Sequence, residues 1–482
     1  MKKYLSDRIK ILCIGLMCLF SSGHCLADAG NRVIFTLEID GKKIGYQKLE
    51  WTLRNGSPHF SETMVMDVAH AKSRSVVRHE FSMWQKPGVD DIYFVKVIDA
   101  GTVKNLQEGR IHDNHVQLKN AKGVYLDTKR VLPDGIVFPA AQLQWYLGKR
   151  LTAAVPLDFQ YFDPQRLAAS VVNVSTCRER TGVTPEMRCW LRKYTSGPRT
   201  NDEFWLFDNK GKLLSIETGF AGIPMIKKPC VANCMDASGQ AWDFIGRLIV
   251  QSPYKIPQKA AKGKINYLLS SKSGRPLSLL DSAEQSVSIV DGKSIVSVCA
   301  DCTGIAEKNA PQLQDYIESN AWVQSDHPEI RRLALSAVSN QATVKTKMLQ
   351  LVKLTQKKMT GMSSYVGYST ALAALRSGSG DCSEFALLLA AFARAQGIPT
   401  RIVFGMAYSS RFTGRANVFS PHAWVQVWDK DRWVSYDAAL SEFDATHIAL
   451  AMGSGSPEEV LEGFNQLSDI KIEQAAAIAV EP

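Results

Sequence analysis

The chain has 482 residues, more than one hydrophobic core accommodates, so two or three domains are expected. Its formal net charge is +10, and loss of residues 1–27 would remove four basic residues and Asp7 and leave about +7, a balance that favours solubility and anionic envelope surfaces. The sequence has no basic stripe with interleaved aromatic residues, so it predicts no nucleic-acid partner.

Residues 1–27 have the pattern of a secretion signal peptide. Four basic residues precede an apolar run, Ile11–Phe20, and this run is too short to span a bilayer comfortably. Cys25-Leu26-Ala27 then resembles a small-residue cleavage site, and a retained membrane anchor is the alternative. No later segment is long and apolar enough for a transmembrane helix. We therefore expect an exported protein, periplasmic or secreted, with no integral membrane span after signal removal.

Residues 28–250 are expected to form a β-rich N-terminal domain. Apolar residues alternate from Val33 to Ile39, Asp40-Gly41 makes a turn, and a second strand follows over 43–53. A further hairpin is predicted where 203–208 and 213–218 flank Asn209-Lys210-Gly211, and 139–147 is a candidate short helix. This domain carries no catalytic motif, so a scaffold, a binding role and a shielding role all stay open.

The second half divides by composition. Residues 251–263 are typical of a linker, and 264–315 predict a small β unit with a strand at 264–269 and a hairpin over 286–298. A third domain is expected over 316–455, and its first part should contain amphipathic helices at 328–339 and 344–359. Residues 456–482 form a tail, predicted as a helix at 457–467 and a strand at 470–480.

Seven of the ten cysteines would remain after removal of the first 27 residues. Six fall into local pairs, and an oxidising compartment would make them disulfides, although sequence alone allows other connectivities; the six are Cys177, Cys189, Cys230, Cys234, Cys299 and Cys302. Two alternatives stay open for part of this set. The spacing of Cys299 and Cys302 also occurs in redox motifs, and together with Cys230 and Cys234 they could form a zinc site.

Cys382 is the odd thiol, and its setting is typical of a nucleophile. Gly378 and Gly380 allow a tight turn before it, and an apolar helix is predicted over 383–396, ended by Gly397. A helix start lowers the pKa of a thiol, because the N-terminal partial charge favours the thiolate. The plain alternative is a buried structural cysteine.

His422 and Asp437 supply the partners that a thiolate enzyme needs. They lie on two strand-like segments separated by the polar turn 429–432, which together predict a β-hairpin. If the loop centres on 430–431, paired residues sum to 861, and His422 and Asp437 become diagonal neighbours on one face. Asp437 could then orient His422, which in turn faces the sulfur.

These motifs together resemble the transglutaminase-like superfamily of papain-type cysteine enzymes. The resemblance covers about 265–455 and includes the Gly380-Asp381-Cys382 turn, the 397–403 segment and His447-Ile448-Ala449-Leu450. It implies an α+β fold in which the helix bearing Cys382 packs on an antiparallel sheet that carries His422 and Asp437. Members often have Asp-Pro where this chain has Asp437-Ala438, and many carry His or Tyr at the position of Phe385.

The resulting expectation is a Cys382–His422–Asp437 hydrolase that acts on peptide or protein substrates without a cofactor or a metal ion. A protein cross-linking transglutaminase and a non-catalytic scaffold or binding protein of the same fold are the alternatives, and thiol–disulfide exchange through Cys299 and Cys302 is a third. The backbone N–H of Cys382 is the expected first oxyanion donor, with Tyr365 or Tyr368 as candidates for the second. The sequence does not predict the oligomeric state.

Overall fold

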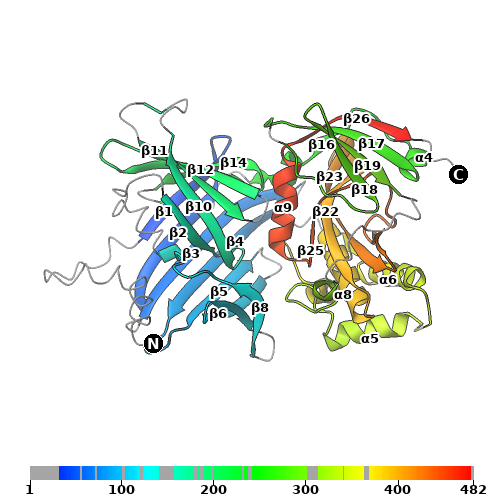
Figure 1. The fold of residues 1–482 in the computed structure, drawn as a ribbon, viewed down its shortest axis with the longest axis horizontal. Helices are drawn as coiled ribbons and strands as arrows, with labels where there is room; N and C mark the ends of the chain where they lie inside the picture. Colours follow the sequence, from blue (N-terminus) through cyan, green and yellow to red (C-terminus); the bar gives the residue numbers. More distant parts are fainter. Residues whose placement is uncertain are drawn as a thin grey trace. The chain divides into compact units, whose positions relative to one another are not determined.

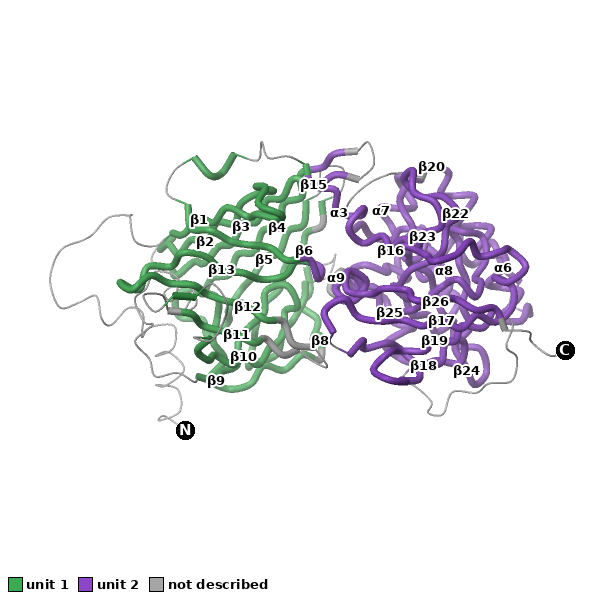
Figure 2. The backbone as a smooth tube through the Cα atoms, turned by 90° about the horizontal axis from the view of Figure 1, so that it is seen from above, with its two compact units in different colours: residues 1–67, 76–220, 224–241 green, residues 68–75, 221–223, 242–482 purple. Residues whose placement is uncertain are grey.

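The computed structural model divides the chain into two compact units, coloured separately in Figure 2. Unit 1 comprises residues 1–67, 76–220 and 224–241, and unit 2 comprises residues 68–75, 221–223 and 242–482. The structure describes residues 32–54, 57–70, 73–99, 104–119, 123–140, 157–177, 183–184, 188–196, 199–230, 233–236, 241–274, 276–300, 313–339, 341–362 and 368–478. Residues 1–27, the predicted signal peptide, lie outside the described ranges, as does most of the helix predicted over 139–147.

The described part of unit 1 is built on one sheet with the strand order β8-β7-β6-β5-β4-β3-β2-β1-β14-β13-β12-β11-β10-β9. Its strands are β1 (Arg32–Ile39), β2 (Lys42–Arg54), β3 (Ser57–His70), β4 (Ser73–Gln85), β5 (Ile92–Asp99), β6 (Lys104–His112), β7 (His115–Lys119), β8 (Tyr125–Val131), β9 (Leu157–Asp163), β10 (Ala168–Thr176), β11 (Arg188–Ser196), β12 (Arg199–Phe207), β13 (Leu213–Phe220) and β14 (Ile223–Pro229). Neighbouring strands are mostly consecutive in sequence and antiparallel, so the sheet grows by hairpins, as alternating apolar patterns with short turns predict.

Period-two alternation explains which face of this sheet is buried. Phe35, Leu37 and Ile39 of β1 are buried, while the residues between them are less so. The β1–β2 turn falls at Asp40 and Gly41, both with positive φ, as the sequence predicts. The core of unit 1 gathers side chains from across the sheet: Phe35, Leu49, Phe60, Phe81, Met83, Phe94, Ile111, Val116, Leu132, Ile136, Phe162, Leu167, Trp205, Phe207, Leu213 and Ile216.

Unit 2 contains two larger sheets and several helices (Figure 1). One sheet has the order β16-β23-β22-β25, with β24 also paired to β23, and the other has the order β18-β19-β17-β26. The strands are β15 (Trp242–Asp243), β16 (Val250–Gln251), β17 (Lys264–Ser271), β18 (Gln285–Val290), β19 (Lys293–Cys299), β20 (Gly361–Met362), β21 (Ser379–Gly380), β22 (Thr400–Phe412), β23 (Arg415–Asp429), β24 (Arg432–Tyr436), β25 (His447–Gly453) and β26 (Ile470–Ile478). The helices are α3 (Phe244–Arg247), α4 (Gln258–Ala261), the 3-10 helix η2 (Gln314–Tyr316), α5 (Pro328–Ala337), α6 (Val344–Lys358), α7 (Ala371–Ser377), α8 (Cys382–Ala395) and α9 (Pro457–Leu467).

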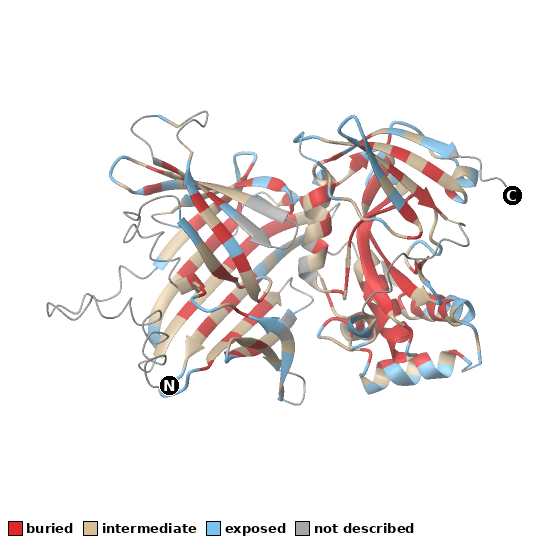
Figure 3. Cartoon of the chain, viewed as in Figure 1, coloured by how far each residue is buried: buried red, intermediate tan, exposed pale blue. Residues whose placement is uncertain are grey.

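Helix α8 is the central element of unit 2. Asp381 caps its start by accepting from the N–H of Ser383, while Glu384 reaches back to the N–H of Asp381 and closes a capping box. Every residue from Glu384 to Ala395 is buried, and Figure 3 shows the helix in red along most of its length. It packs against β22 and β23, so the helix expected to bear Cys382 does lie on an antiparallel sheet. The fold class predicted from the sequence is confirmed.

The predicted linker and tail both contribute ordered elements to unit 2. Within the predicted linker, Gln251 extends strand β16, which pairs with β23, and 258–261 form α4. In the predicted tail, β26 pairs with β17 and so belongs to the same sheet as the predicted small β unit. These elements do not test the domain boundaries predicted from composition, which stay predictions. None of the helices in the described ranges has the length and apolar character needed to cross a membrane.

Two of the three local cysteine pairs form disulfides. Cys177 bonds Cys189, with their Cα atoms 5.2 Å apart, and Cys230 bonds Cys234, at 6.2 Å. Cys299 is also disulfide-bonded, whereas Cys302 lies outside the described residues. A zinc site that uses Cys230 and Cys234 as thiolates is incompatible with their disulfide, because a metal-ligating cysteine must be a free thiolate.

Candidate active site

Cys382 begins helix α8 and is the free cysteine of the described residues. Gly378 ends the preceding helix α7 with φ of 65°, a left-handed conformation that glycine adopts without strain. A Cβ at Gly380 would overlap the side chain of Glu384, so only glycine fits the turn in front of Cys382. The sulfur is part-buried and receives the backbone N–H of Ala423 from strand β23.

The pKa of the Cys382 thiol is raised, not lowered. Burial raises the pKa of this thiol well above its usual value, the charges of Asp381, Glu384 and Asp437 add to that effect, and the N–H of Ala423 opposes it only in part. The expectation drawn from the helix dipole is therefore wrong in its net direction. The main physical reason is burial of the thiol, and the capping box that starts α8 adds to it by placing two acidic side chains beside the sulfur.

His422 and Asp437 are joined by a short buried hydrogen bond. Strands β23 and β24 pair from Val425↔Tyr436 to Asp429↔Arg432, so every pair sums to 861 and the loop is Lys430–Asp431, as predicted. Nε2 of His422 lies 2.7 Å from Oδ2 of Asp437, and the two residues are 7% and 1% exposed. Because an ionised carboxylate only accepts hydrogen bonds, His422 carries its proton on Nε2 and leaves Nδ1 as the basic nitrogen.

Asp437 is also held by His447, a residue that the sequence did not single out as part of the site. Nε2 of His447 lies 3.1 Å from the same Oδ2 atom, and the N–H groups of Ala439 and Leu440 donate to Oδ1 at 2.7 and 3.1 Å. Burial raises the pKa of Asp437, but the two histidines outweigh it and hold the pKa below its usual value. Asp437 is therefore an ionised carboxylate with all of its acceptor sites in use.

Among the described residues, no hydrogen bond joins the sulfur of Cys382 to His422. The sulfur is nevertheless adjacent to this strand, because it meets the N–H of Ala423, the residue that follows His422. Cys382 and the His422–Asp437 pair therefore lie next to each other, without a hydrogen bond between the sulfur and the imidazole. Catalytic hydrogen bonds are often long in unliganded enzymes and tighten when substrate binds.

A second buried network fixes the strand that carries His422. The ring of Trp424 stacks on His422 with centroids 6.1 Å apart, and its Nε1 donates to Oγ of Ser435 at 3.2 Å. Ser435 in turn donates its backbone N–H to Oε1 of Glu284 at 2.9 Å, and Gln426 donates to Oε2 at 3.1 Å. Glu284 precedes β18, so the smaller sheet helps to set the position of His422 through Trp424.

The donor chemistry of the site has two further features. Ligand-type atoms of His422, Asp437 and His447 lie within 4.8 Å of one another, but hydrogen bonds account for both histidine–Asp437 contacts, and we assign no metal ligand there. The hydroxyl of Tyr368 donates to the carbonyl of Gly455 at 3.0 Å, which removes it as an oxyanion donor. Tyr365 lies outside the described residues, and Phe385 is a buried residue of α8.

A comparison with known families matches part of unit 2. Residues 331–438 match the family model of the transglutaminase-like superfamily, a range that contains Cys382, His422 and Asp437. This part of the chain is a transglutaminase-like domain. The match stops before His447.

Several solved structures resemble parts of the chain, and their TM-scores are too low to carry an argument. A proposed cysteine protease from Cytophaga hutchinsonii is 14% identical with a TM-score of 0.29, and the match covers 45% of this chain and 84% of that one. A protein of a domain family of unknown function from Brucella abortus is 15% identical with a TM-score of 0.31, covering 43% and 98%. The periplasmic domain of TgpA from Pseudomonas aeruginosa is 15% identical with a TM-score of 0.28, covering 61% and 91%. No curated protein matches the chain.

Proposed function

We propose that the chain is a cysteine-dependent acyl-transfer enzyme that hydrolyses peptide or amide bonds through Cys382, His422 and Asp437. The observation that carries the proposal is the buried 2.7 Å hydrogen bond between His422 and Asp437, one residue from the backbone position that meets the Cys382 sulfur. The odd, unbridged thiol at a helix start supports it as well. A merely structural cysteine needs no buried histidine–carboxylate pair beside it.

The first half-reaction forms a thioester. The sulfur of Cys382 attacks the carbonyl carbon of the substrate, while Nδ1 of His422 accepts the thiol proton. Asp437 keeps the other proton on Nε2 and stabilises the imidazolium that forms. The C–N bond of the tetrahedral intermediate then breaks, and His422 gives its proton to the leaving amine. The N–H of Cys382 is one of the helix-terminal donors without an intrahelical acceptor and is the proposed oxyanion donor.

The second half-reaction consumes the thioester. Water attacks the acyl carbon with His422 as the general base, and the Cys382 thiol is regenerated with a free carboxylic acid as the product. An amine in place of water would give a new amide, the transglutaminase outcome, from the same intermediate. Because burial raises the pKa of Cys382, the resting nucleophile is a thiol, and its proton moves to His422 during the attack rather than before it.

A peptide-mixture assay tests the proposal. The purified full chain is incubated with a diverse peptide mixture, with and without an excess of a primary amine, and the products are identified by mass spectrometry. We expect new carboxyl termini, or deamidated side chains, that are absent with Cys382→Ala. Ser383→Ala is the matched control, because only the backbone N–H of that residue is hydrogen-bonded to the cap.

The possible results of that assay separate the alternatives. Amine adducts without hydrolysis would replace the hydrolase with a cross-linking enzyme of the same triad. Products that persist in Cys382→Ala, or no product with any peptide, would contradict the enzyme proposal and favour a scaffold or binding protein. Fast alkylation of Cys299 rather than Cys382 in the native, unreduced protein would favour thiol–disulfide exchange.

We also propose that the protein acts after export. The disulfides Cys177–Cys189 and Cys230–Cys234 are typical of oxidising compartments, and residues 1–27 have the composition of a signal peptide. Fractionation of cells that make the full chain should find it outside the cytoplasm, with an amino terminus near Asp28 by mass spectrometry. An intact amino terminus on cytoplasmic protein with free thiols would contradict export.

A further inference from the structure

His447 occupies a position that the triad alone does not explain. It is the first residue of β25, pairs with Ala407 of β22, and is 2% exposed. Its Nε2 lies 3.1 Å from Oδ2 of Asp437, the oxygen that His422 contacts from the other side at 2.7 Å. The two imidazole rings are edge to face, with centroids 5.4 Å apart. One carboxylate oxygen is therefore hydrogen-bonded to two histidines.

The other nitrogen of His447 is anchored as firmly. Nδ1 lies 3.1 Å from Oδ1 of Asp444 and 3.1 Å from the carbonyl oxygen of the same residue. Asp444 is itself fixed, because its Oδ1 accepts the N–H and the hydroxyl of Thr446. Asp437, His447 and Asp444 thus form a line of carboxylate, imidazole and carboxylate, with a ring nitrogen facing each acid.

This arrangement favours a cation. A carboxylate only accepts hydrogen bonds, so a ring nitrogen aimed at each of two acids favours the doubly protonated imidazolium, although the backbone N–H of Asp444 also lies 3.3 Å from Nδ1. Burial lowers the pKa of His447, but the hydrogen bonds and charges of Asp437 and Asp444 outweigh it and raise the pKa to about 9. Geometry and electrostatics give the same charge state at neutral pH.

Within the described residues, Asp437 and Asp444 are the charged groups that set the pKa of His447. The groups that face His447 are Asp437 and Asp444 from the segment between β24 and β25, and His422 from β23. Tyr267 of β17 donates its hydroxyl to the carbonyl of Ala445 beside Asp444, and burial raises the pKa of this phenol well above its usual value, so it stays neutral. Trp424 and Phe443 contribute only aromatic contacts to the ring.

We propose that His447 is a positioning residue for the site, which holds Oδ2 of Asp437 in line with His422 and offsets the charge of that carboxylate. This inference rests on the proposed acyl-transfer function. The hydrogen bond fixes the side-chain conformation of Asp437, and the charge sets how strongly Asp437 favours the imidazolium of His422. In this proposal, five side chains act on one another in sequence: Cys382, His422, Asp437, His447 and Asp444.

The two contributions can be separated by substitution. His447→Gln keeps an N–H donor near the position of Nε2 and removes the charge, whereas His447→Leu removes both. We expect His447→Gln to retain turnover within about tenfold of the wild type at its own optimal pH, and His447→Leu to lose about a hundredfold or more, in line with other groups that orient a catalytic residue. His327→Gln, which alters the cap of α5, is the matched control.

The pH profile separates positioning from simple structural support. Without the cation, the charge of Asp437 is uncompensated, so the imidazolium of His422 is favoured and a thiolate at Cys382 is disfavoured. Both limbs of the kcat/KM profile should therefore move to higher pH in His447→Gln, by about one pH unit for a charge at this separation. Equal losses in both variants with unmoved limbs, in proteins of unchanged Tm, would overturn the inference.

A spectroscopic measurement keeps this inference distinct from the proposed function. Nitrogen-15 histidine NMR of the Cys382→Ala full chain should show both ring nitrogens of His447 protonated from pH 5 to 8. It should also show the ring-nitrogen signals of His422 changing when His447→Gln is added. That result in a protein that turns over no peptide would retain the charge arrangement and reject acyl transfer. A neutral His447 at pH 7 would reject the inference, whatever the activity.

Discussion

The two units surround their acidic side chains differently, and the difference shows what makes a site. In unit 1, burial raises the pKa of Glu62, although Gln47 donates to it at 2.6 Å, and burial also raises the pKa of Asp163, which two backbone N–H groups cap. In unit 2, Asp437 is buried as well, yet its pKa is lowered. Two imidazoles on one oxygen account for the change of sign. Burial of an acid therefore does not mark a site, but convergence of histidine donors on it does.

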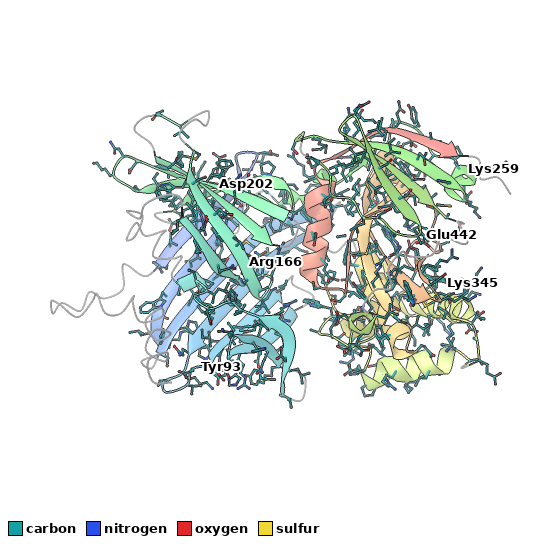
Figure 4. All side chains as sticks on the ribbon, in the orientation of Figure 1. Tyr93, Arg166, Asp202, Lys259, Lys345 and Glu442 are labelled. Atoms are coloured by element: carbon teal, nitrogen blue, oxygen red, sulfur yellow. A yellow bond between two sulfur atoms is a disulfide. The ribbon has the colours of Figure 1, made fainter. Side chains whose placement is uncertain are left out.

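The chain has many charged side chains that take no part in such convergence. Glu442 lies in the same segment as Asp437 and Asp444, is labelled in Figure 4, and is exposed with only a 3.8 Å ion pair to Lys262. Exposed ion pairs of this kind contribute little to stability. The contrast within five residues of Asp437 supports geometry, rather than sequence proximity, as the criterion for site membership.

The largest expected effect is on turnover when Asp437 loses its charge. Asp437→Asn should leave the fold intact and lower kcat by about a thousandfold to ten-thousandfold, because an amide can hold His422 in the wrong tautomer. Asp431→Asn is the matched control, since Asp431 is exposed in the β23–β24 loop and should change stability by no more than about 0.5 kcal/mol. Similar kcat values for the two variants would mean that Asp437 does not orient His422.

Removing a disulfide from unit 1 should affect stability without affecting the chemistry. The double substitution Cys177→Ser and Cys189→Ser opens a loop of 12 residues and should cost about 2–3 kcal/mol in the free energy of unfolding. Urea unfolding would measure the loss, and the peptide assay should show unchanged kcat. A large loss of activity in a folded variant would contradict the assignment of the chemistry to unit 2 alone.

The charge on His447 should make stability depend on pH. Its pKa is raised from about 6.5 in the unfolded chain to about 9 in the fold, so its contribution is complete below pH 6.5 and is lost as the pH rises through 9. The loss should be on the order of 3 kcal/mol between pH 6.5 and 10. Urea unfolding at both pH values should show a smaller decline in His447→Gln than in the wild type or His327→Gln. Equal declines in all three proteins would contradict a charged His447.

The smallest expected effect is a gain in the stability of unit 1, opposite in sign to the losses predicted above. Because burial raises the pKa of Glu62, its ionised form opposes folding at pH 7, so Glu62→Gln should stabilise unit 1 by up to about 1 kcal/mol. The new side chain can still accept from Gln47 through its carbonyl oxygen. Thermal unfolding at pH 7 measures the gain. Destabilisation would indicate that Glu62, like Asp437, is an ionised partner in a charge network.

Local patterns explain why much of unit 2 could be predicted from sequence. The apolar run after Cys382 predicts a buried helix, which the structure has over Cys382–Ala395, and the polar turn at Lys430–Asp431 sets the register that joins His422 to Asp437. Both features depend on contacts between residues close in sequence. The hairpin of 203–208 with 213–218 in unit 1 was predictable for the same reason.

The missed features depend on contacts between distant segments. His447 begins an apolar strand, and sequence gives no sign that β25 pairs with β22 rather than with β24, which it follows. The three-residue spacing to Asp444 and the ten-residue spacing to Asp437 are the only local hints. The raised pKa of Cys382 was missed because it reflects burial and the nearby acidic residues Asp381 and Glu384, which outweigh the helix start.

Direct capture of the acyl-enzyme tests the central claim most sharply. The full chain is mixed with the peptide mixture, quenched in acid during turnover and digested, and the peptide bearing Cys382 is examined by mass spectrometry. We expect an acyl adduct on Cys382 that hydroxylamine removes, and that forms far more slowly in His422→Ala. Turnover with no adduct on Cys382, or with the adduct on another residue, would contradict the proposed mechanism.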